Sequence, residues 1–254
     1  QTNHTQPALL TASVALWRLW QENSDVSPSV IAGHSLGEYS ALVCAGVLSL
    51  EDAVVLVEKR GQFMQASVPE GIGAMAAVIG LADEEIVKAC EQAAGEEVVS
   101  AVNFNSPGQV VIAGHKAAIE RAGELCKEAG AKRVLPLPVS VPSHCALMKD
   151  AADKLSEELA SVTFNAPNVP VINNVDVAIE NDAEAIKNAL IRQLYSPVRW
   201  TETVQEMSKS GVAIAFEVGA GKVLQGLLKR IDKSLVSVSI NDQATLSKAL
   251  ETIE

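Results

Sequence analysis

Aromatic residues and cysteines are scarce in this 254-residue chain, and each shortage limits what the protein can be. Aromatics make up only 4% of the residues, so the core must be built mainly from Ala, Val, Leu and Ile, as suits a sheet covered by close-packed helices. The four cysteines lie far apart and form no C-x-x-C pair: Cys44, Cys90, Cys126 and Cys145. This spacing suggests neither a zinc site nor a disulfide framework, and it favours a reducing compartment.

Basic residues and long apolar runs are also in short supply. The chain has 20 Lys and Arg against 31 Asp and Glu, which gives a formal net charge of −11. The summed field repels polyanions and argues against nucleic acid or an anionic membrane as the main partner. No apolar run is long enough to cross a bilayer, and no charged-then-apolar signal segment opens the sequence. We therefore expect a soluble, cytoplasmic protein.

The order of the predicted elements indicates an α/β protein of two parts. Short apolar strands alternate with helices before residue 68 and after residue 141, which predicts a parallel sheet covered on both faces. In between, the order is strand, helix, strand, strand, helix, strand, at residues 74–79, 83–93, 98–104, 109–113, 116–128 and 132–139. That order is typical of a ferredoxin-like module, and the prolines of its last strand predict an edge position. We predict a large domain, residues 1–68 and 141–254, with a small ferredoxin-like subdomain, residues 69–140, inserted.

One pentapeptide indicates a catalytic serine. Gly33-His34-Ser35-Leu36-Gly37 follows a short apolar run and precedes a helical segment, which is the context of a serine nucleophile on a strand-to-helix elbow. The flanking glycines permit a sharp turn, and the helix that follows offers free N–H groups to an oxyanion. The alternative is a glycine-flanked serine that only caps the helix.

A serine nucleophile needs a base, and His144 is the best placed of the four histidines. His4 lies near the start of the chain, His34 is next to the serine and should point away from it, and His115 begins a predicted helix. His144 lies in the helix-breaking stretch 139–145, where the small subdomain rejoins the large domain and a cleft can form. The alternative is a buried structural histidine. No histidine occurs after residue 144, so the nucleophile-acid-histidine order of an α/β-hydrolase fits poorly.

Arg60 lies on an otherwise apolar predicted helix that follows the elbow. Its guanidinium could hold a carboxylate through two hydrogen bonds. The alternative is a solvated cation on a helix surface, since charged side chains are mostly exposed.

Taken together, these segments resemble the malonyl-CoA:acyl carrier protein transacylase family over essentially the whole chain. The matching pieces are residues 5–9, 33–38, 60–61, 103–109 (Asn-Phe-Asn-Ser-Pro-Gly-Gln), 142–144 and 217–219. The resemblance implies a large domain of α/β-hydrolase-like fold. It also implies transfer of malonyl from malonyl-CoA to the phosphopantetheine thiol of acyl carrier protein in fatty acid biosynthesis, with no cofactor beyond these substrates.

The resemblance further assigns roles to individual residues. Ser35 would form a malonyl ester with His144 as its base, oriented by the backbone carbonyl of Gln193, and the amide of Leu36 would donate to the oxyanion. Arg60 would pair with the malonyl carboxylate. The remaining substrate-binding residues would be His34, Met64 and Asn105.

The sequence departs from the family pattern at two places. It lacks the family's N-terminal Gly-Gln-Gly-Ser-Gln segment, and a molecule without that segment would lose one oxyanion donor and one central strand. Ala220 stands where Gly-Pro-Gly is common, which predicts only a local change in stiffness. Two other functions stay open: a serine hydrolase or thioesterase, and an inactive, truncated domain that only binds carrier protein. Because carrier proteins are acidic, docking should use local basic residues, for which the candidates are Lys132, Arg133, Lys229 and Arg230.

Overall fold

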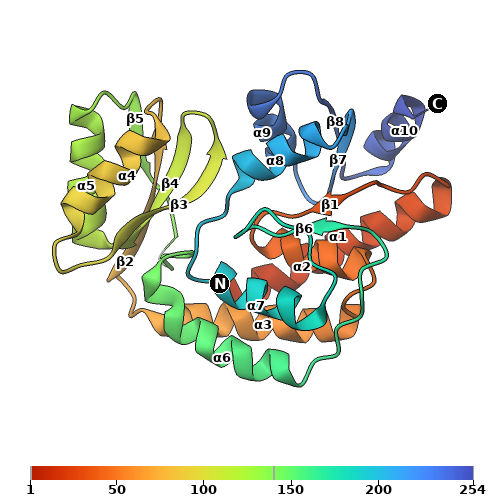
Figure 1. Cartoon of the computed structure of the whole chain (residues 1–254), viewed down its shortest axis with the longest axis horizontal. Helices are drawn as coiled ribbons and strands as arrows, with labels where there is room; N and C mark the ends of the chain where they lie inside the picture. Colours follow the sequence, from red (N-terminus) through yellow and green to blue (C-terminus); the bar gives the residue numbers. More distant parts are fainter. Residues whose placement is uncertain (1, 140, 254) are drawn as a thin grey trace.

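The computed structural model describes residues 2–139 and 141–253 (Figure 1). Gln1 and Ser140, which end two of the predicted domain segments, lie outside the described residues. The elements follow in this order: α1 (Thr2–Asn23), β1 (Ile31–Ala32), α2 (Leu36–Cys44), α3 (Leu50–Ser67), β2 (Gly73–Ile79), α4 (Asp83–Ala94), β3 (Val99–Ser106), β4 (Gln109–His115), α5 (Lys116–Glu128), β5 (Arg133–Pro136), a short 3-10 turn (Ala146–Met148), α6 (Lys149–Ala160), β6 (Val171–Ile172), α7 (Ala183–Gln193), α8 (Trp200–Lys209), β7 (Ile214–Val218), α9 (Val223–Ile231), β8 (Val236–Ile240) and α10 (Gln243–Thr252).

Residues 73–136 form a four-stranded sheet with α4 and α5 on one face, seen at the left of Figure 1. The strand order is β3-β4-β2-β5, and the neighbouring strands are antiparallel. β5 lies at the edge, as the prolines of the predicted strand 132–139 indicate, because a proline has no N–H to donate to a second neighbour. It also ends at Pro136, three residues earlier than predicted. Apolar residues of the sheet and of both helices form a core of their own, which contains the buried thiols of Cys90 and Cys126.

The remaining strands form two parallel pairs, β1 with β6 and β7 with β8. The sequence predicts one buried parallel sheet, but in the described residues no strand joins β1 to β7. β7 is accordingly only half-buried along its length, where the sequence predicts a buried strand over residues 212–218. β6 is also shorter than predicted, since it ends after two residues. Asn173 and Asn174 come next, and their side chains form hydrogen bonds to the following loop and to the elbow.

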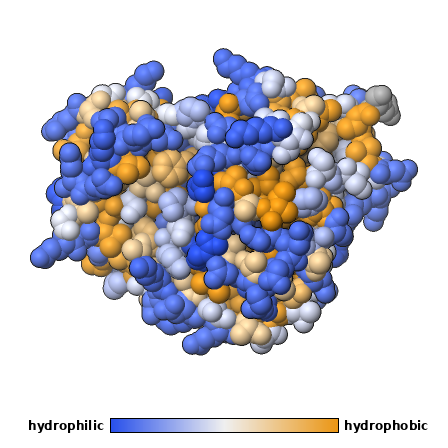
Figure 2. Space-filling view, in the orientation of Figure 1, coloured by the Kyte–Doolittle hydropathy of each residue, from blue (hydrophilic) through white to orange (hydrophobic). Residues whose placement is uncertain are grey.

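Helices α1, α2, α3, α6 and α7 enclose a core around β1 and β6 that is built almost entirely of Ala, Val, Leu and Ile, as the low aromatic content predicts. Figure 1 shows these helices layered below β1 and β6. On the face drawn in Figure 2, polar side chains surround small hydrophobic patches, the largest of them just right of the centre. Among the described residues, no helix is both long and apolar enough to cross a membrane.

The two parts are joined by backbone hydrogen bonds beside the site. The end of β3 pairs in parallel with the chain before α8, where Phe104 N donates to Val198 O at 3.0 Å and Val198 N donates to Val102 O at 2.9 Å. The hydroxyl of Thr201 also donates to Phe104 O, at 3.0 Å. These contacts bring the end of β3 next to the elbow that follows β1.

Candidate active site

The elbow between β1 and α2 has the strand-turn-helix form that the sequence predicts. Ser35 has φ 54° and ψ −111°, a left-handed conformation that side chains rarely adopt. Gly33 makes the turn possible, because a Cβ at this position would lie 1.9 Å from the carbonyl oxygen of Gly37. Ser35 directly precedes Leu36, the first residue of α2. The Leu36 amide has no hydrogen-bond partner within residues 2–139 and 141–253.

Ser35, His144 and Gln193 form a hydrogen-bonded chain. The Ser35 hydroxyl donates to His144 Nε2 at 2.8 Å, and His144 Nδ1 donates to the backbone oxygen of Gln193 at 2.7 Å. Because a carbonyl only accepts, the proton of the neutral imidazole lies on Nδ1 and Nε2 is free to accept. His144 itself has φ 63° and its amide donates to Leu194 O at 3.0 Å, so its position is fixed from both sides.

The surroundings of His144 favour the neutral imidazole. Burial and, next in size, the positive charge of Arg60 lower the pKa of His144 to about 3, while the hydrogen bond to the Gln193 carbonyl opposes this shift. The imidazole is therefore neutral, and able to take a proton, throughout the neutral and mildly acidic range.

Arg60 brings a buried positive charge to the same place. It projects from α3 and is only 2% exposed. Its guanidinium donates to Gln6 Oε1 at 2.6 Å, to Gln193 Oε1 at 3.0 Å and to Ser35 Oγ at 3.2 Å, and it lies over the Tyr39 ring at 5.4 Å.

All the polar partners of Arg60 are neutral. No ion pair of Arg60 occurs in the described part of the chain, and its Nε has no hydrogen-bond partner there. Burial lowers its pKa from the usual value, although a guanidinium keeps its proton at any physiological pH. A buried cation next to a serine hydroxyl and without an acidic partner is suited to bind an anionic substrate group.

Two residues that the sequence analysis did not single out support the elbow from below. Asn174 is fully buried: its Oδ1 accepts from Ser35 N at 2.7 Å, and its Nδ2 donates to Gly33 O at 2.7 Å. Glu38, on the first turn of α2, accepts from Asn174 N at 3.0 Å and from Gln193 Nε2 at 2.9 Å. Burial raises the pKa of Glu38 to about 7, and the hydrogen bonds from Gln193 and Asn174 oppose this rise.

One signal could have directed attention to Asn174. It lies near the carboxyl end of the buried strand predicted over residues 169–175, and parallel sheets present their functional residues at that end.

The other predicted residues lie around this centre. His34 Nε2 donates to Asn105 Oδ1 at 2.7 Å, and its ring lies 5.5 Å from that of Trp200, so it is directed to the end of β3 and not to the serine hydroxyl. Met64 is buried behind Gln6, whose amide lies 3.8 Å from the sulfur. The structure thus brings Ser35, His144, Gln193, Arg60 and the Leu36 amide together, with the His34–Asn105 pair beside them and Met64 one layer further back.

The remaining histidines are elsewhere. His115 precedes α5 and accepts from Val98 N at 2.9 Å, and His4 is exposed on α1. Within the described residues, no group of three or more His, Cys, Asp or Glu is arranged to hold a metal ion.

Comparison with known proteins agrees with this arrangement. A family model described as the acyl transferase domain matches residues 1–247. The malonyl CoA-acyl carrier protein transacylase of Escherichia coli K12 is 65% identical over 251 residues, which cover 99% of this chain and 81% of that protein. The chain belongs to this family of acyl transferases.

Other members of the family show the same extent of similarity. The Bacillus subtilis malonyl CoA-acyl carrier protein transacylase is 47% identical over 255 residues, which cover 100% of the chain and 80% of that protein. The crystal structure of an acyl carrier protein S-malonyltransferase from Vibrio cholerae matches with a TM-score of 0.97 and 67% identity, covering 98% of this chain and 81% of that one.

A further solved structure of the family is a complex. It holds a malonyl-transacylase bound to a type II polyketide acyl-carrier protein, and it matches with a TM-score of 0.98 and 61% identity, covering 99% of this chain and 82% of that one. The resemblance inferred from the sequence motifs is therefore confirmed, and the mixed α/β fold with parallel strands agrees with these structures.

Proposed function

We propose that this acyltransferase moves the malonyl group of malonyl-CoA to the phosphopantetheine thiol of acyl carrier protein, through an ester of Ser35, in fatty acid biosynthesis. The observation that carries this proposal is the buried Arg60, which has no acidic partner among the described residues and lies within hydrogen-bond distance of the Ser35 hydroxyl. The names of the similar proteins support the same substrate and partner. The proposed reaction needs no cofactor beyond its two substrates, malonyl-CoA and the phosphopantetheine thiol of carrier protein.

In the first half-reaction, Ser35 Oγ attacks the thioester carbonyl of malonyl-CoA while its proton moves to His144 Nε2. The Gln193 backbone oxygen holds Nδ1–H and stabilises the imidazolium that forms. The Leu36 amide, at the N-terminus of α2, donates to the developing oxyanion. Collapse of the tetrahedral intermediate breaks the C–S bond, and the CoA sulfur leaves with the proton from His144.

In the second half-reaction, the carrier thiol takes the place of the serine hydroxyl. Its proton moves to His144 Nε2 as its sulfur attacks the ester carbonyl, and the Ser35 oxygen leaves with that same proton. The two halves are the same chemistry in opposite directions, so one base with one orienting carbonyl serves both.

Arg60 would select malonyl over neutral acyl groups. The terminal carboxylate of malonyl can supply the acidic partner that this guanidinium lacks among the residues described. An acetyl group would leave the buried cation unpaired, which is costly in a dry site. A hydrolase of neutral esters would have no use for such a cation.

The architecture we propose is an α/β-hydrolase-like domain of residues 1–68 and 141–254 with a ferredoxin-like subdomain of residues 69–140. The strand order β3-β4-β2-β5 with two helices on one face supports the second part, and the separate hydrophobic core inside it supports the boundary. The site lies where the two parts meet, since His34 is on one and Asn105 is on the other.

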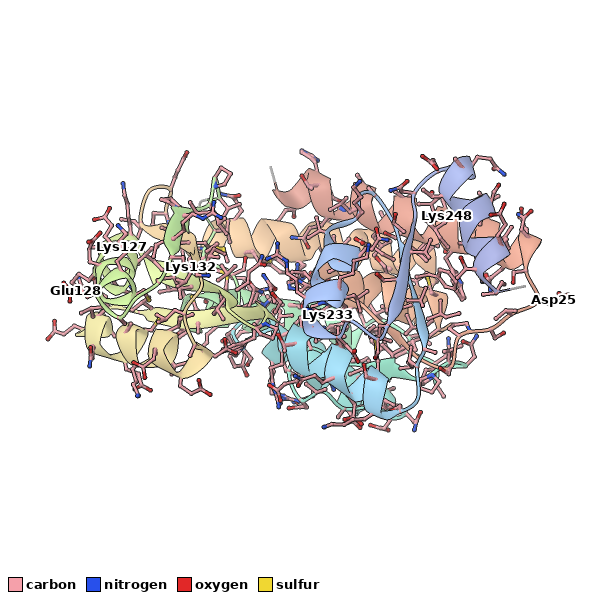
Figure 3. All side chains as sticks on the ribbon, turned by 90° about the horizontal axis from the view of Figure 1, so that it is seen from above. Asp25, Lys127, Glu128, Lys132, Lys233 and Lys248 are labelled. Carbon is pink, nitrogen blue, oxygen red and sulfur yellow. The ribbon has the colours of Figure 1, made fainter. Side chains whose placement is uncertain are left out.

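We further propose that carrier protein docks on a basic surface formed by Lys132, Arg133, Lys229 and Arg230. All four side chains are exposed. Arg230 on α9 donates to Gln109 Oε1 at 3.2 Å, and Gln109 and Arg133 both pair with the last residue of β2, so α9 and this end of the sheet are neighbours. Figure 3, viewed from above, shows Lys132 on the part with the four-stranded sheet and Lys233, which follows α9, on the other. Such a surface can attract an acidic partner to a chain that is itself acidic.

Intact-mass spectrometry tests the proposed reaction. The chain is mixed briefly with malonyl-CoA or acetyl-CoA, and then with the thiol form of carrier protein. We expect a malonyl adduct that Ser35→Ala abolishes and that carrier protein discharges, with its malonyl group appearing on the carrier. Adduct lost to water with no malonyl-carrier would indicate a thioesterase. A folded chain that binds carrier but never forms an adduct would indicate a binding domain.

Arg60→Met is the companion variant. It removes the cation, so we expect acylation by malonyl-CoA to fall by about 100-fold or more relative to acylation by acetyl-CoA, the effect of breaking a buried charge pair. An unchanged preference for malonyl would contradict the role given to Arg60.

A further inference from the structure

The side-chain amide of Gln193 can take only one of its two orientations. Its Nε2 faces two strong acceptors, Glu38 Oε2 at 2.9 Å and Ser35 O at 3.0 Å, and its Oε1 faces the Arg60 guanidinium at 3.0 Å. Turning the amide over would place its oxygen against the carboxylate and its NH₂ group against the guanidinium. Both contacts would then be repulsive, because the carboxylate only accepts and the guanidinium only donates.

Glu38 is 2% exposed, and burial raises its pKa to about 7, so above that pH it is the charged member of this set. Asn174 Oδ1 is a weaker neighbour of the same amide, at 3.4 Å, and it already accepts from Ser35 N. Ser35 O is a neutral carbonyl. The carboxylate is therefore the group whose charge most strongly holds the positive end of the amide dipole.

The amide of Gln193 separates the two buried charges. Arg60 has no ion pair among the residues described. Glu38 therefore stabilises the charge of Arg60 indirectly, through the dipole of the Gln193 amide that lies between the carboxylate and the guanidinium. A carboxylate in direct contact would occupy the hydrogen-bond donors of Arg60 and compete with the substrate. An intervening amide holds the guanidinium in place and leaves its charge unpaired.

We propose that Glu38 is a positioning residue for malonyl selection: its carboxylate fixes the Gln193 amide, which in turn holds the Arg60 guanidinium at the Ser35 hydroxyl. This inference rests on the function proposed above and extends it to a residue that does not touch the substrate.

The test compares acylation by malonyl-CoA and by acetyl-CoA, measured as kcat/KM by quenched flow and intact mass. Glu38 also accepts from the Asn174 amide, so a change here affects the elbow and lowers both rates. That common effect cancels in the ratio of the two rates, so the ratio reports only how well the Arg60 guanidinium favours malonyl over acetyl. We expect Glu38→Met to lower the malonyl-to-acetyl ratio by about tenfold or more, and Glu38→Gln, which keeps an acceptor oxygen, to lower it by about threefold or less.

A double-variant cycle shows whether the effect passes through Gln193. Gln193→Met keeps the backbone oxygen that holds His144 and removes only the amide. We expect Glu38→Met to leave the ratio unchanged when it is made in the Gln193→Met background, because the connection is already broken. If Glu38→Met unfolds the chain, Glu38→Asp provides the measurement: its shorter carboxylate withdraws from the amide but keeps the charge, and the ratio should again fall.

Each outcome has a separate meaning. Equal losses with both substrates, or additive effects of the two substitutions, would overturn the inference and leave Glu38 as a support of the elbow only. In those cases the wild-type chain still prefers malonyl, and the proposed function stands. A wild-type chain that forms no malonyl ester, or has no preference for malonyl, would overturn both.

Discussion

The acid side of the pH profile tests the environment of His144. An ordinary imidazole, with a pKa of 6.5, is only about 3% neutral at pH 5, so a base of this kind would lose about 30-fold in rate between pH 8 and pH 5. With its pKa lowered to about 3 by burial and by the charge of Arg60, His144 is still about 99% neutral at pH 5. We therefore expect kcat/KM for acylation to change by less than about twofold across this range.

The assay is single-turnover formation of the acyl-enzyme, quenched and read by intact mass at a series of pH values. The pH dependence of kcat/KM reports the pKa values of the free enzyme, so it is not affected by the pairing of Arg60 with the malonyl carboxylate in the complex. Glu38 titrates near pH 7 and could add a small step of its own, so the profile is repeated in Glu38→Gln, which cannot titrate.

Arg60→Met is the matched perturbation, assayed with acetyl-CoA. Removing the guanidinium removes the second-largest cause of the lowered pKa of His144, while burial, the largest, is retained. The acid limb should therefore move up toward neutral pH but stay below 6.5. A wild-type profile that falls between pH 7 and 6, and is not altered by Glu38→Gln, would refute this account of the site.

Three further predictions concern the elbow and the carrier. Gly33→Ala should lower the free energy of unfolding, measured in urea, by at least about 3 kcal/mol, since its Cβ would lie 1.9 Å from a backbone oxygen. Gly37→Ala is the control: nothing lies within 4 Å of its new Cβ, so the free energy of unfolding should stay unchanged or rise by up to about 1 kcal/mol. Asn174→Ala leaves a buried amide and a buried carbonyl of the elbow unpaired, and should cost about 2–4 kcal/mol in the same assay. Reversing Lys132 and Arg133 to Glu should raise KM for carrier protein about tenfold and more than it raises KM for malonyl-CoA; equal changes in the two would contradict docking at this surface.

The local features of this protein follow from residues that are neighbours in the chain. The elbow depends on residues within one turn of each other: a glycine whose missing Cβ permits the contact with Gly37, and a serine between a strand and a helix. The edge position of β5 depends on prolines that cannot donate hydrogen bonds. The choice of His144 needed only the positions of four histidines and a helix-breaking segment. Its hydrogen bond to Ser35 agrees with that choice, and the catalytic role stays a prediction.

The tertiary structure decided what depends on distant contacts. Arg60 could equally have been a solvated helix cation, and only the packing of α3 beside α1 and the elbow buries it beside Gln6 and Gln193. The contact between Glu38 and Asn174 was not predictable from the sequence, because it joins positions 136 residues apart. The division of the parallel strands into two pairs was likewise not predictable, since alternation of strands and helices specifies that strands are parallel but not which of them become neighbours. Local backbone geometry can be read from adjacent residues, whereas the charge and hydrogen-bond state of a buried side chain is set by whatever the rest of the chain places around it.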